Sequence, residues 1–226
     1  MKKIGLIVAI EINSVLIRYG KPVAEKEAAG CRIFEYNTGR YSLIVAHCGA
    51  GEIAAATATQ YLITAYGVDL ILNFGVVGGL TADMAKTKVC IIEKVVHYDF
   101  DTSAVDEGVV PGRYIQYPDV YIPMSEETVK QALGVYPDLK PVTCASGDKF
   151  VADPKIKAEL HEKYGADICE MEAAGIALTC DRNGIPCLLV KIVSDGIVGG
   201  AEEYLAAKYE TADICFGIVD RIIDGL

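Results

Sequence analysis

The chain has 226 residues, of which 52% are hydrophobic. A chain of this length and apolar content buries one sizeable core, so residues 1–226 are predicted to form a single domain. The formal net charge of −10 at pH 7 argues against general binding of nucleic acid or of an anionic membrane, and no apolar run reaches the roughly 18 residues that a membrane span needs.

The cysteines indicate the cellular compartment of the protein, and the histidines indicate whether it binds a metal. Eight cysteines are spread along the chain without a Cys-x-x-Cys pair, and most lie in apolar runs. This is typical of reduced, buried thiols, and no signal peptide is recognisable after Met1, so a cytoplasmic protein is expected. Three histidines leave few ligands for a zinc site. We expect no metal and no other cofactor.

Taken in order, short apolar runs alternate with helical segments. In the first half we expect strands at 4–10 and 70–74, a helix over 11–19, a hairpin of 31–36 and 41–47, and a helix over 52–66. The second half predicts strands at 88–97, 141–146, 167–169 and 187–193, and helices over 154–164, 172–182 and 204–223. Residues 99–117 carry scattered Gly, Pro and charge, which indicates a long loop.

This alternation, interrupted by one early hairpin, predicts the α/β class. The expected architecture is a three-layer α/β/α domain whose central sheet is mixed and mainly parallel. In such sheets the ligand crevice lies beyond the carboxyl ends of the strands. Unusual residues stand at four of these ends: residues 9–13, 75–79, 168–174 and 191–196.

The glycines at 75, 78 and 79 are ambiguous by themselves. Missing side chains let the backbone approach a ligand closely, but the same glycines fit a tight turn between a strand and a helix. They form neither a Gly-x-Gly-x-x-Gly fingerprint nor a Walker loop. Gly49-Ala50-Gly51 allows the same two interpretations.

Carboxylates mark the other two strand ends. Glu170 and Glu172 flank a methionine where an apolar strand meets an Ala-rich helix. Carboxylates are seldom buried unpaired, so at least one of the two should have a specific partner unless both are solvated charges at a helix N-terminus. Asp195 follows Ser194 at the end of the last strand. It fits an Asx-turn or helix cap, or alternatively an acid that protonates a heterocycle, a role that requires desolvation or a developing charge nearby.

Together these motifs resemble the nucleoside phosphorylase/nucleosidase superfamily, most closely its bacterial 5′-methylthioadenosine/S-adenosylhomocysteine nucleosidases. The resemblance covers nearly the whole chain in unbroken order. It is carried by residues 4–9, 49–56, 73–80, 98–101, 111–112, 146–150, 170–173 and 193–195, with Glu-Met-Glu-Ala and Ser-Asp as the most specific pair. It implies a phosphorylase/hydrolase-like fold, cleavage of the N-glycosidic bond of a purine nucleoside, and a homodimer.

The resemblance also implies roles on the side of the purine. Asp195 would share a proton with N7 and contact the group at C6, with Ser194 holding its carboxylate in place. Phe150 would stack on the base, and Val151 would offer backbone hydrogen bonds to its edge.

On the ribose side, Glu172 would accept hydrogen bonds from the 2′- and 3′-hydroxyls and favour the cation that develops at C1′. Met171 would pack under the ribose. Pro111 and its loop would reach the 5′ pocket of a neighbouring subunit. The remaining expected contacts with the substrate are Ala9, Ile10, Ala50, Val76, Gly78 and Glu170.

The chain departs from the family at the site of the attacking water. The catalytic glutamate expected just after the first strand aligns with Asn13, and an amide orients water without taking its proton. Glu11 is expected to be a poor substitute, because two positions along a helix turn a side chain by about 200°. Val76 replaces a serine that is usual in the nucleosidases.

The segment after Asp195 departs as well. It is shorter than in the family and lacks an aromatic residue of the pocket. Ala201 is nearest in order, and Tyr204 is the expected substitute.

Three functions stay open at this point. The chain is a hydrolase, a phosphorylase in which phosphate attacks and no base is needed, or a nucleoside-binding protein with little activity. A phosphorylase would need cations for the anion. Arg18 and Arg40 are placed for this by position, although ordinary ion pairs at the surface explain both equally.

Overall fold

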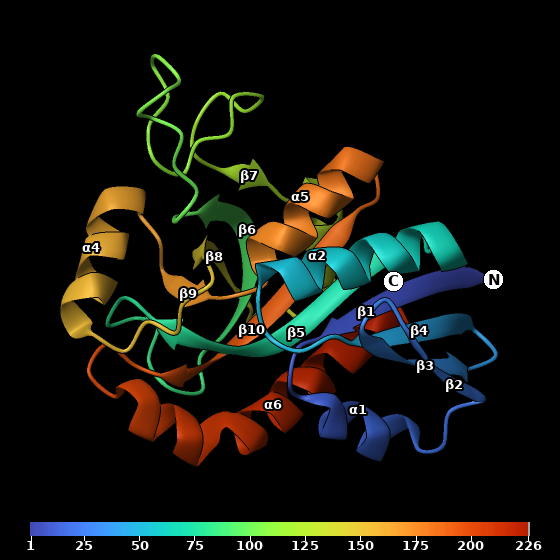
Figure 1. Cartoon of the computed structure of the whole chain (residues 1–226). Coiled ribbons are helices and arrows are strands. Elements are labelled where there is room, and N and C mark those ends of the chain that lie inside the picture. The colour runs from blue at the N-terminus through green and yellow to red at the C-terminus, as the bar shows by residue number, and fades with distance from the viewer. Residues whose placement is uncertain (226) are drawn as a thin grey trace.

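The computed structural model describes residues 1–225 (Figure 1). Their strands form one mixed sheet in the order β10-β6-β8-β9-β5-β1-β4-β3-β2, and β7 pairs with β6. The strands are β1 (Lys2–Val8), β2 (Ala24–Ala28), β3 (Cys31–Asn37), β4 (Tyr41–His47), β5 (Leu70–Gly79), β6 (Val89–His97), β7 (Ile122–Pro123), β8 (Lys140–Ser146), β9 (Ile168–Glu170) and β10 (Cys187–Asp195).

The sheet is open at one end and closed at the other. Strands β4, β1, β5 and β10 pair in parallel, and the hairpin of β3 and β4 with the charged strand β2 extends the open end. At the other end, β5 pairs with both β10 and β9, so that β5, β10, β6, β8 and β9 form a closed ring. The prediction of a mixed α/β sheet is confirmed.

Helices cover both faces of the sheet. Figure 1 shows α2 and α5 on one face and α1 and α6 on the opposite face, with α4 beside the closed end. The helices are α1 (Ile12–Tyr19), α2 (Glu52–Tyr61) with its π-helical extension η1 (Leu62–Tyr66), α3 (Glu126–Val135), α4 (Pro154–Tyr164), α5 (Ala173–Asn183) and α6 (Gly200–Gly225). No helix in residues 1–225 is long and apolar enough to cross a membrane.

The central strands are buried on both sides, which explains their nearly unbroken apolar sequences. All nine residues of β10 are buried, including Lys191, Ser194 and Asp195. Buried polar groups need partners, so these three side chains mark a specialised part of the sheet. All eight cysteines are free, and all but Cys48 are buried.

The glycine-rich segment 75–79 corrects one prediction. It is not a turn after the strand but the second half of β5, paired with β10 and then with β9. The glycines serve close packing, since a Cβ atom on Gly79 would lie 2.0 Å from the carbonyl oxygen of Met84. The strand can therefore run on to the closed end of the sheet.

Three elements had no clear signal in the sequence. Strand β2 is an edge strand with the sequence AEKEA and no buried position, so it lacks the apolar alternation by which strands are recognised. Strand β7 has two residues, and α3 buries three of its ten. Helix α6 begins at Gly200, four residues before the predicted start.

Candidate active site

A cleft with an empty volume of about 560 Å³ lies where several strands end, within the size range usual for small-molecule sites. The lining residues come from the segments just after β1, β4 and β8 and from the last residues of β5, β9 and β10. Tyr204 of α6 lies at one side. Twelve of the residues predicted for the site line it: Ala9, Ile10, Ala50, Val76, Gly78, Phe150, Val151, Glu170, Met171, Glu172, Ser194 and Asp195.

Asn13 and Pro111, predicted for the site, are not among the lining residues. The side chain of Asn13 is exposed on helix α1, which corrects its expected position at the attacking water. Pro111 lies in the loop 98–121, which projects from the end of the molecule beside β7 (Figure 1). Pro111 therefore lies outside the cleft of its own subunit.

Glu11 lies in the part of the cleft where Asn13 was expected. It lines the cleft and is 6% exposed. Helix α1 begins only at Ile12, so Glu11 precedes the helix and the argument from helical spacing does not apply to it. The expectation that Glu11 points away from the site was therefore wrong.

The backbone holds the Glu11 carboxylate in place. The N–H of Val76 donates to Oε1 at 3.2 Å, and the N–H of Ile10 donates to Oε2 at 3.1 Å. Gly75 leaves room for it, because a Cβ atom there would lie 3.0 Å from Oε1. Two hydrogen bonds and the space left by Gly75 fix this carboxylate beside the middle of β5.

Asp195 and Lys157 form a buried ion pair at another wall of the cleft. Nζ of Lys157 lies 2.6 Å from Oδ2 of Asp195, and both side chains are at most 2% exposed. Ser194 donates to Oδ1 at 2.9 Å, as the resemblance implied. Burial raises the pKa of Asp195, while Lys157 and Ser194 oppose the rise. A desolvated Asp195 suits the chemistry of an acid near neutral pH.

Lys191 and Glu170 form a second buried ion pair, 3.2 Å apart. Glu170 also accepts from Ser146 and from the backbone N–H groups of Glu172 and Ala173. Burial would raise the pKa of Glu170, but the charge of Lys191 and these hydrogen bonds outweigh it and lower the pKa. Glu170 is thus an ionised anchor that fixes the junction of β9 and α5.

Glu172 lies at the N-cap position of α5, beyond the strand that ends with Glu170. Its Oε1 accepts from the N–H of Gly51 at 3.0 Å. Burial, and then the negative charge of Glu170, raise the pKa of Glu172 to about 7. The two glutamates therefore differ in role: Glu170 is fully engaged within the protein, and Glu172 faces the cleft.

Glu52 completes this group of carboxyls from α2. It contacts the Ser146 hydroxyl, whose single hydrogen is donated to Glu170, it accepts a hydrogen bond from the N–H of Gly175, and it is 6% exposed. Burial, and then Glu170, raise its pKa to about 8. Nothing in the sequence distinguished Glu52 from an ordinary residue in the first turn of a helix.

The raised pKa of Glu52 predicts a change in pH-dependent stability on substitution. The folded protein holds the proton of Glu52 more tightly than the unfolded chain does. The contribution of this proton to the free energy of unfolding is therefore fully present below pH 4.5 and is lost as pH rises through about 8. Glu52→Gln should remove this dependence. The stability of the variant relative to wild type should therefore be higher at pH 8.5 than at pH 5. A gain of roughly 3–4 kcal/mol raises Tm by about 6–16 °C. Thermal unfolding at both pH values measures it, and a Tm difference independent of pH would contradict it.

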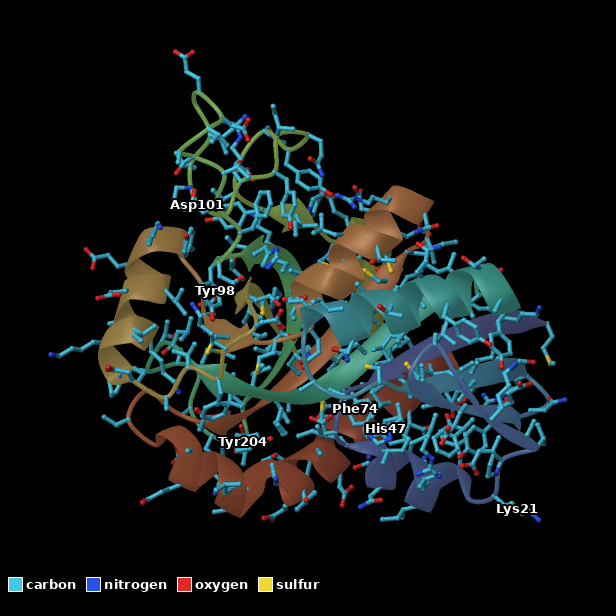
Figure 2. All side chains as sticks on the ribbon, in the orientation of Figure 1. Lys21, His47, Phe74, Tyr98, Asp101 and Tyr204 are labelled. Atoms are coloured by element: carbon cyan, nitrogen blue, oxygen red, sulfur yellow. The ribbon has the colours of Figure 1, made fainter. Side chains whose placement is uncertain are left out.

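Phe150 and Tyr204 line the cleft together. Their ring centroids lie 5.1 Å apart in an edge-to-face arrangement, and Phe150 is 47% exposed. Figure 2 shows Tyr204 between helix α6 and the sheet. The expectation that Tyr204 supplies an aromatic residue after Asp195 agrees with this placement, and Ala201 does not line the cleft.

Arg18 and Arg40 lie outside the cleft. Arg18 pairs with Asp220, and Arg40 pairs with Asp224 at 2.5 Å. Both arginines are thus engaged in ion pairs with helix α6, as the alternative from surface pairing predicted. The cation among the residues that line the cleft is Lys149, which is exposed.

Residues 3–224 match the family model described as the Phosphorylase superfamily. The 5′-methylthioadenosine/S-adenosylhomocysteine nucleosidase of Tolumonas auensis is 31% identical to this chain over 229 residues, which cover 94% of this chain and 96% of that protein. The protein of the same name from a Geobacillus species is 31% identical over 238 residues, with 97% and 99% covered.

Two solved structures from Helicobacter pylori have a similar fold. A mutant of futalosine hydrolase superposes with a TM-score of 0.94 at 27% identity and covers 100% of both chains. A 5′-methylthioadenosine/S-adenosylhomocysteine nucleosidase superposes with a TM-score of 0.94 at 26% identity, with 100% of this chain and 99% of the other covered. With its sequence matched from residue 3 to residue 224, this chain belongs to the phosphorylase superfamily.

Proposed function

We propose that this chain hydrolyses the N-glycosidic bond of a purine nucleoside and releases the free base. The substrate would be methylthioadenosine, S-adenosylhomocysteine or a related nucleoside, as the names of its relatives suggest. The observation that carries the proposal is one cleft lined by Glu11, Glu172 and Asp195. Cleavage of the bond needs a proton acceptor for the attacking water, a negative charge near the sugar and a proton donor for the leaving base. These three carboxyl groups would supply them.

On the side of the base, Asp195 would give a proton to N7 as the bond to C1′ breaks. The negative charge that moves onto the purine is then neutralised, which makes the base a better leaving group. Ser194 orients the carboxyl group through its 2.9 Å hydrogen bond. Phe150 offers a face for stacking, and the backbone of Val151 lies in the same wall.

On the side of the sugar, the transition state would resemble an oxocarbenium ion. Glu172 would accept hydrogen bonds from the 2′- and 3′-hydroxyls, and negative charge on it would stabilise the developing cation at C1′. The hydrogen bond from Gly51 holds this side chain in place. Met171 would pack under the ribose.

Glu11 would accept the proton of the attacking water. A carboxylate accepts protons and an amide does not, so Glu11 supplies what Asn13 lacks. Its two backbone hydrogen bonds leave lone pairs on both oxygens for a water molecule. A base in this position favours hydrolysis over the alternative of a nucleoside-binding protein.

The placement of cations argues against the phosphorylase alternative. A phosphate nucleophile would need guanidinium or backbone donors at the sugar side, but Arg18 and Arg40 are engaged elsewhere. Val76 has no hydroxyl to offer to an anion, and its backbone N–H is already used by Glu11. Water is therefore the proposed nucleophile.

Release of free base from a panel of nucleosides, separated by chromatography, tests the proposal. The panel holds methylthioadenosine, S-adenosylhomocysteine, futalosine, adenosine and inosine, each with and without phosphate. We expect release of base without phosphate, at a rate that phosphate does not increase. Release that requires phosphate and yields a sugar 1-phosphate would show a phosphorylase, and binding without release would show a binding protein.

We also propose that the protein is a cytoplasmic homodimer. The loop 98–121 exposes Val105, Val110 and Ile115, and apolar side chains gathered on one projecting loop favour a protein contact. Pro111 in this loop would reach the partner's 5′ pocket. Light scattering coupled to size-exclusion chromatography measures the mass in solution, and a mass near 24 kDa would contradict the dimer.

A further inference from the structure

Lys157 is buried without any exposed surface, although it lies on α4, whose neighbouring residues are exposed. Its ammonium group donates to Oδ2 of Asp195 at 2.6 Å and to the carbonyl oxygen of Gly196 at 2.7 Å. A buried lysine requires a specific partner, and here the partner is the carboxyl that would protonate the leaving base.

The surroundings of Asp195 single out Lys157. Ser194 donates to Oδ1, and Cys169 of β9 lies in the same wall. From α6, Glu203 adds negative charge near Asp195, and Tyr204 faces the same cleft. Among residues 1–225, Lys157 forms the one ion pair that Asp195 makes.

Gly78 makes room for this pair. A Cβ atom on Gly78 would lie 3.3 Å from both Oδ2 of Asp195 and Nζ of Lys157, and 3.0 Å from the sulfur of Cys169. The polar pair thus abuts the backbone of the strand that lines the cleft. Such a pair contributes little net stability over apolar residues of similar volume, so stability alone does not explain it.

We propose that Lys157 and Asp195 act as one unit that stores the proton delivered to the leaving purine, with Lys157 as the positioning residue that supplies this proton through Asp195. The inference rests on the proposed function and adds the source of the proton. Ammonium with carboxylate and amine with carboxylic acid differ only in where one proton lies along the 2.6 Å contact.

The proposed step moves one proton from the pair to the purine. The C1′–N9 bond breaks and its electron pair moves onto the purine, while a proton passes from Asp195 to N7. This proton comes from Lys157, which gives it to the Asp195 carboxylate as that group passes it on to N7, so the pair is left as a neutral amine beside a carboxylate. Water adds to C1′ and loses a proton to Glu11, and exchange with solvent then returns one proton from Glu11 to the pair.

This arrangement keeps one proton on the pair at a pH where an aspartic acid alone would be ionised. Burial raises the pKa of Asp195, but a lone carboxyl still loses its proton well before an ammonium group does. The pair therefore retains a transferable proton to higher pH. The alkaline limb of the pH–rate profile should report the pair and not Asp195 by itself.

Three variants test the inference through kcat/KM for a purine nucleoside between pH 5 and pH 10. Lys157→Met removes the proton store but leaves a buried Asp195 that binds a proton itself. Lys157→Arg keeps the positive charge but cannot give up its proton. Lys155→Met is the matched control, because Lys155 is an exposed lysine two residues away on the same helix.

We expect the alkaline limb to move to lower pH in Lys157→Met, with a loss of about 10–100-fold at pH 8.5, and no change in Lys155→Met. At pH 7 activity should fall in the order wild type, Met variant, Arg variant, because the fixed guanidinium keeps Asp195 ionised and empty. A tether that merely holds Asp195 predicts the opposite order for the two variants.

An Arg variant as active as wild type, or a Met variant with an unchanged alkaline limb, would overturn the inference. Thermal unfolding checks that each variant is folded, and if one of them is not, the result from the other decides. A wild-type protein that releases no base would overturn the proposed function and this inference together. Base release by wild type with an unaffected Met variant would overturn the inference alone.

Discussion

Glu11→Gln should lower kcat for nucleoside hydrolysis by about 10²–10⁴-fold, the range typical for loss of a general base. Glutamine has nearly the same shape and keeps one oxygen for the N–H of Val76 or Ile10, but it cannot take a proton from water. Steady-state assays of base release measure the loss. KM should change little, because the proposed role of Glu11 lies in the transition state.

Asn13 offers the matched control for this prediction. Its side chain is exposed on α1, so Asn13→Ala and Asn13→Glu should both keep kcat within about twofold of wild type. A large increase in Asn13→Glu would instead mean that the glutamate of the family can act from position 13 and that Glu11 is not the base. Equal activity of Glu11→Gln and wild type would exclude Glu11 directly.

Asp195→Asn should lower kcat/KM for purine nucleosides by about 10²–10⁴-fold, because the amide cannot deliver a proton to N7. The substitution also leaves Lys157 charged and buried without its partner, which costs roughly 3–5 kcal/mol of stability. Assays are therefore made below the Tm of the variant, measured by thermal unfolding. The double variant Asp195→Asn with Lys157→Met removes the unpaired charge and should regain stability but not activity.

A riboside with a different leaving group separates this role from a general loss of structure. In 4-nitrophenyl β-D-riboside the phenolate leaves without protonation, so Asp195→Asn should lose less than about 10-fold with it. Equal losses with the nitrophenyl riboside and with a purine nucleoside would contradict protonation of the base by Asp195.

The two ends of the cleft were predictable to different degrees. Ser194 and Asp195 end an apolar strand, and Glu172 follows another, so their gathering at strand ends follows from the geometry of α/β sheets. The position of Glu11, the proposed base for the attacking water, does not follow from this geometry. Alignment favours position 13, and helical spacing disfavours Glu11. The spacing argument fails because the helix begins at Ile12, one residue later than predicted.

The two buried lysines, Lys191 and Lys157, also differ in how far the sequence predicts their burial. Lys191 stands out as a single charge within an apolar strand, and a buried partner could be expected for it. Lys157 has no such signal, since it lies between exposed positions of a helix that also carries Lys155 and Lys163. Only the tertiary structure brings the ammonium group of this one lysine to Asp195, beside Gly78 of β5.

The sequence by itself determined the α/β class, the hairpin, the long loop and the identity of most residues that line the cleft. The class, the hairpin and the loop follow from periodicity and turn residues, which are local properties of the chain. Most of the cleft residues follow instead from the resemblance of the motifs to a known family. The tertiary structure decided that Glu11 and not Asn13 enters the cleft, that the glycine segment continues β5, and that Lys157 meets Asp195. Each depends on atoms far apart in sequence, Glu11 with Val76 and Lys157 with Asp195, and local pattern does not encode such contacts.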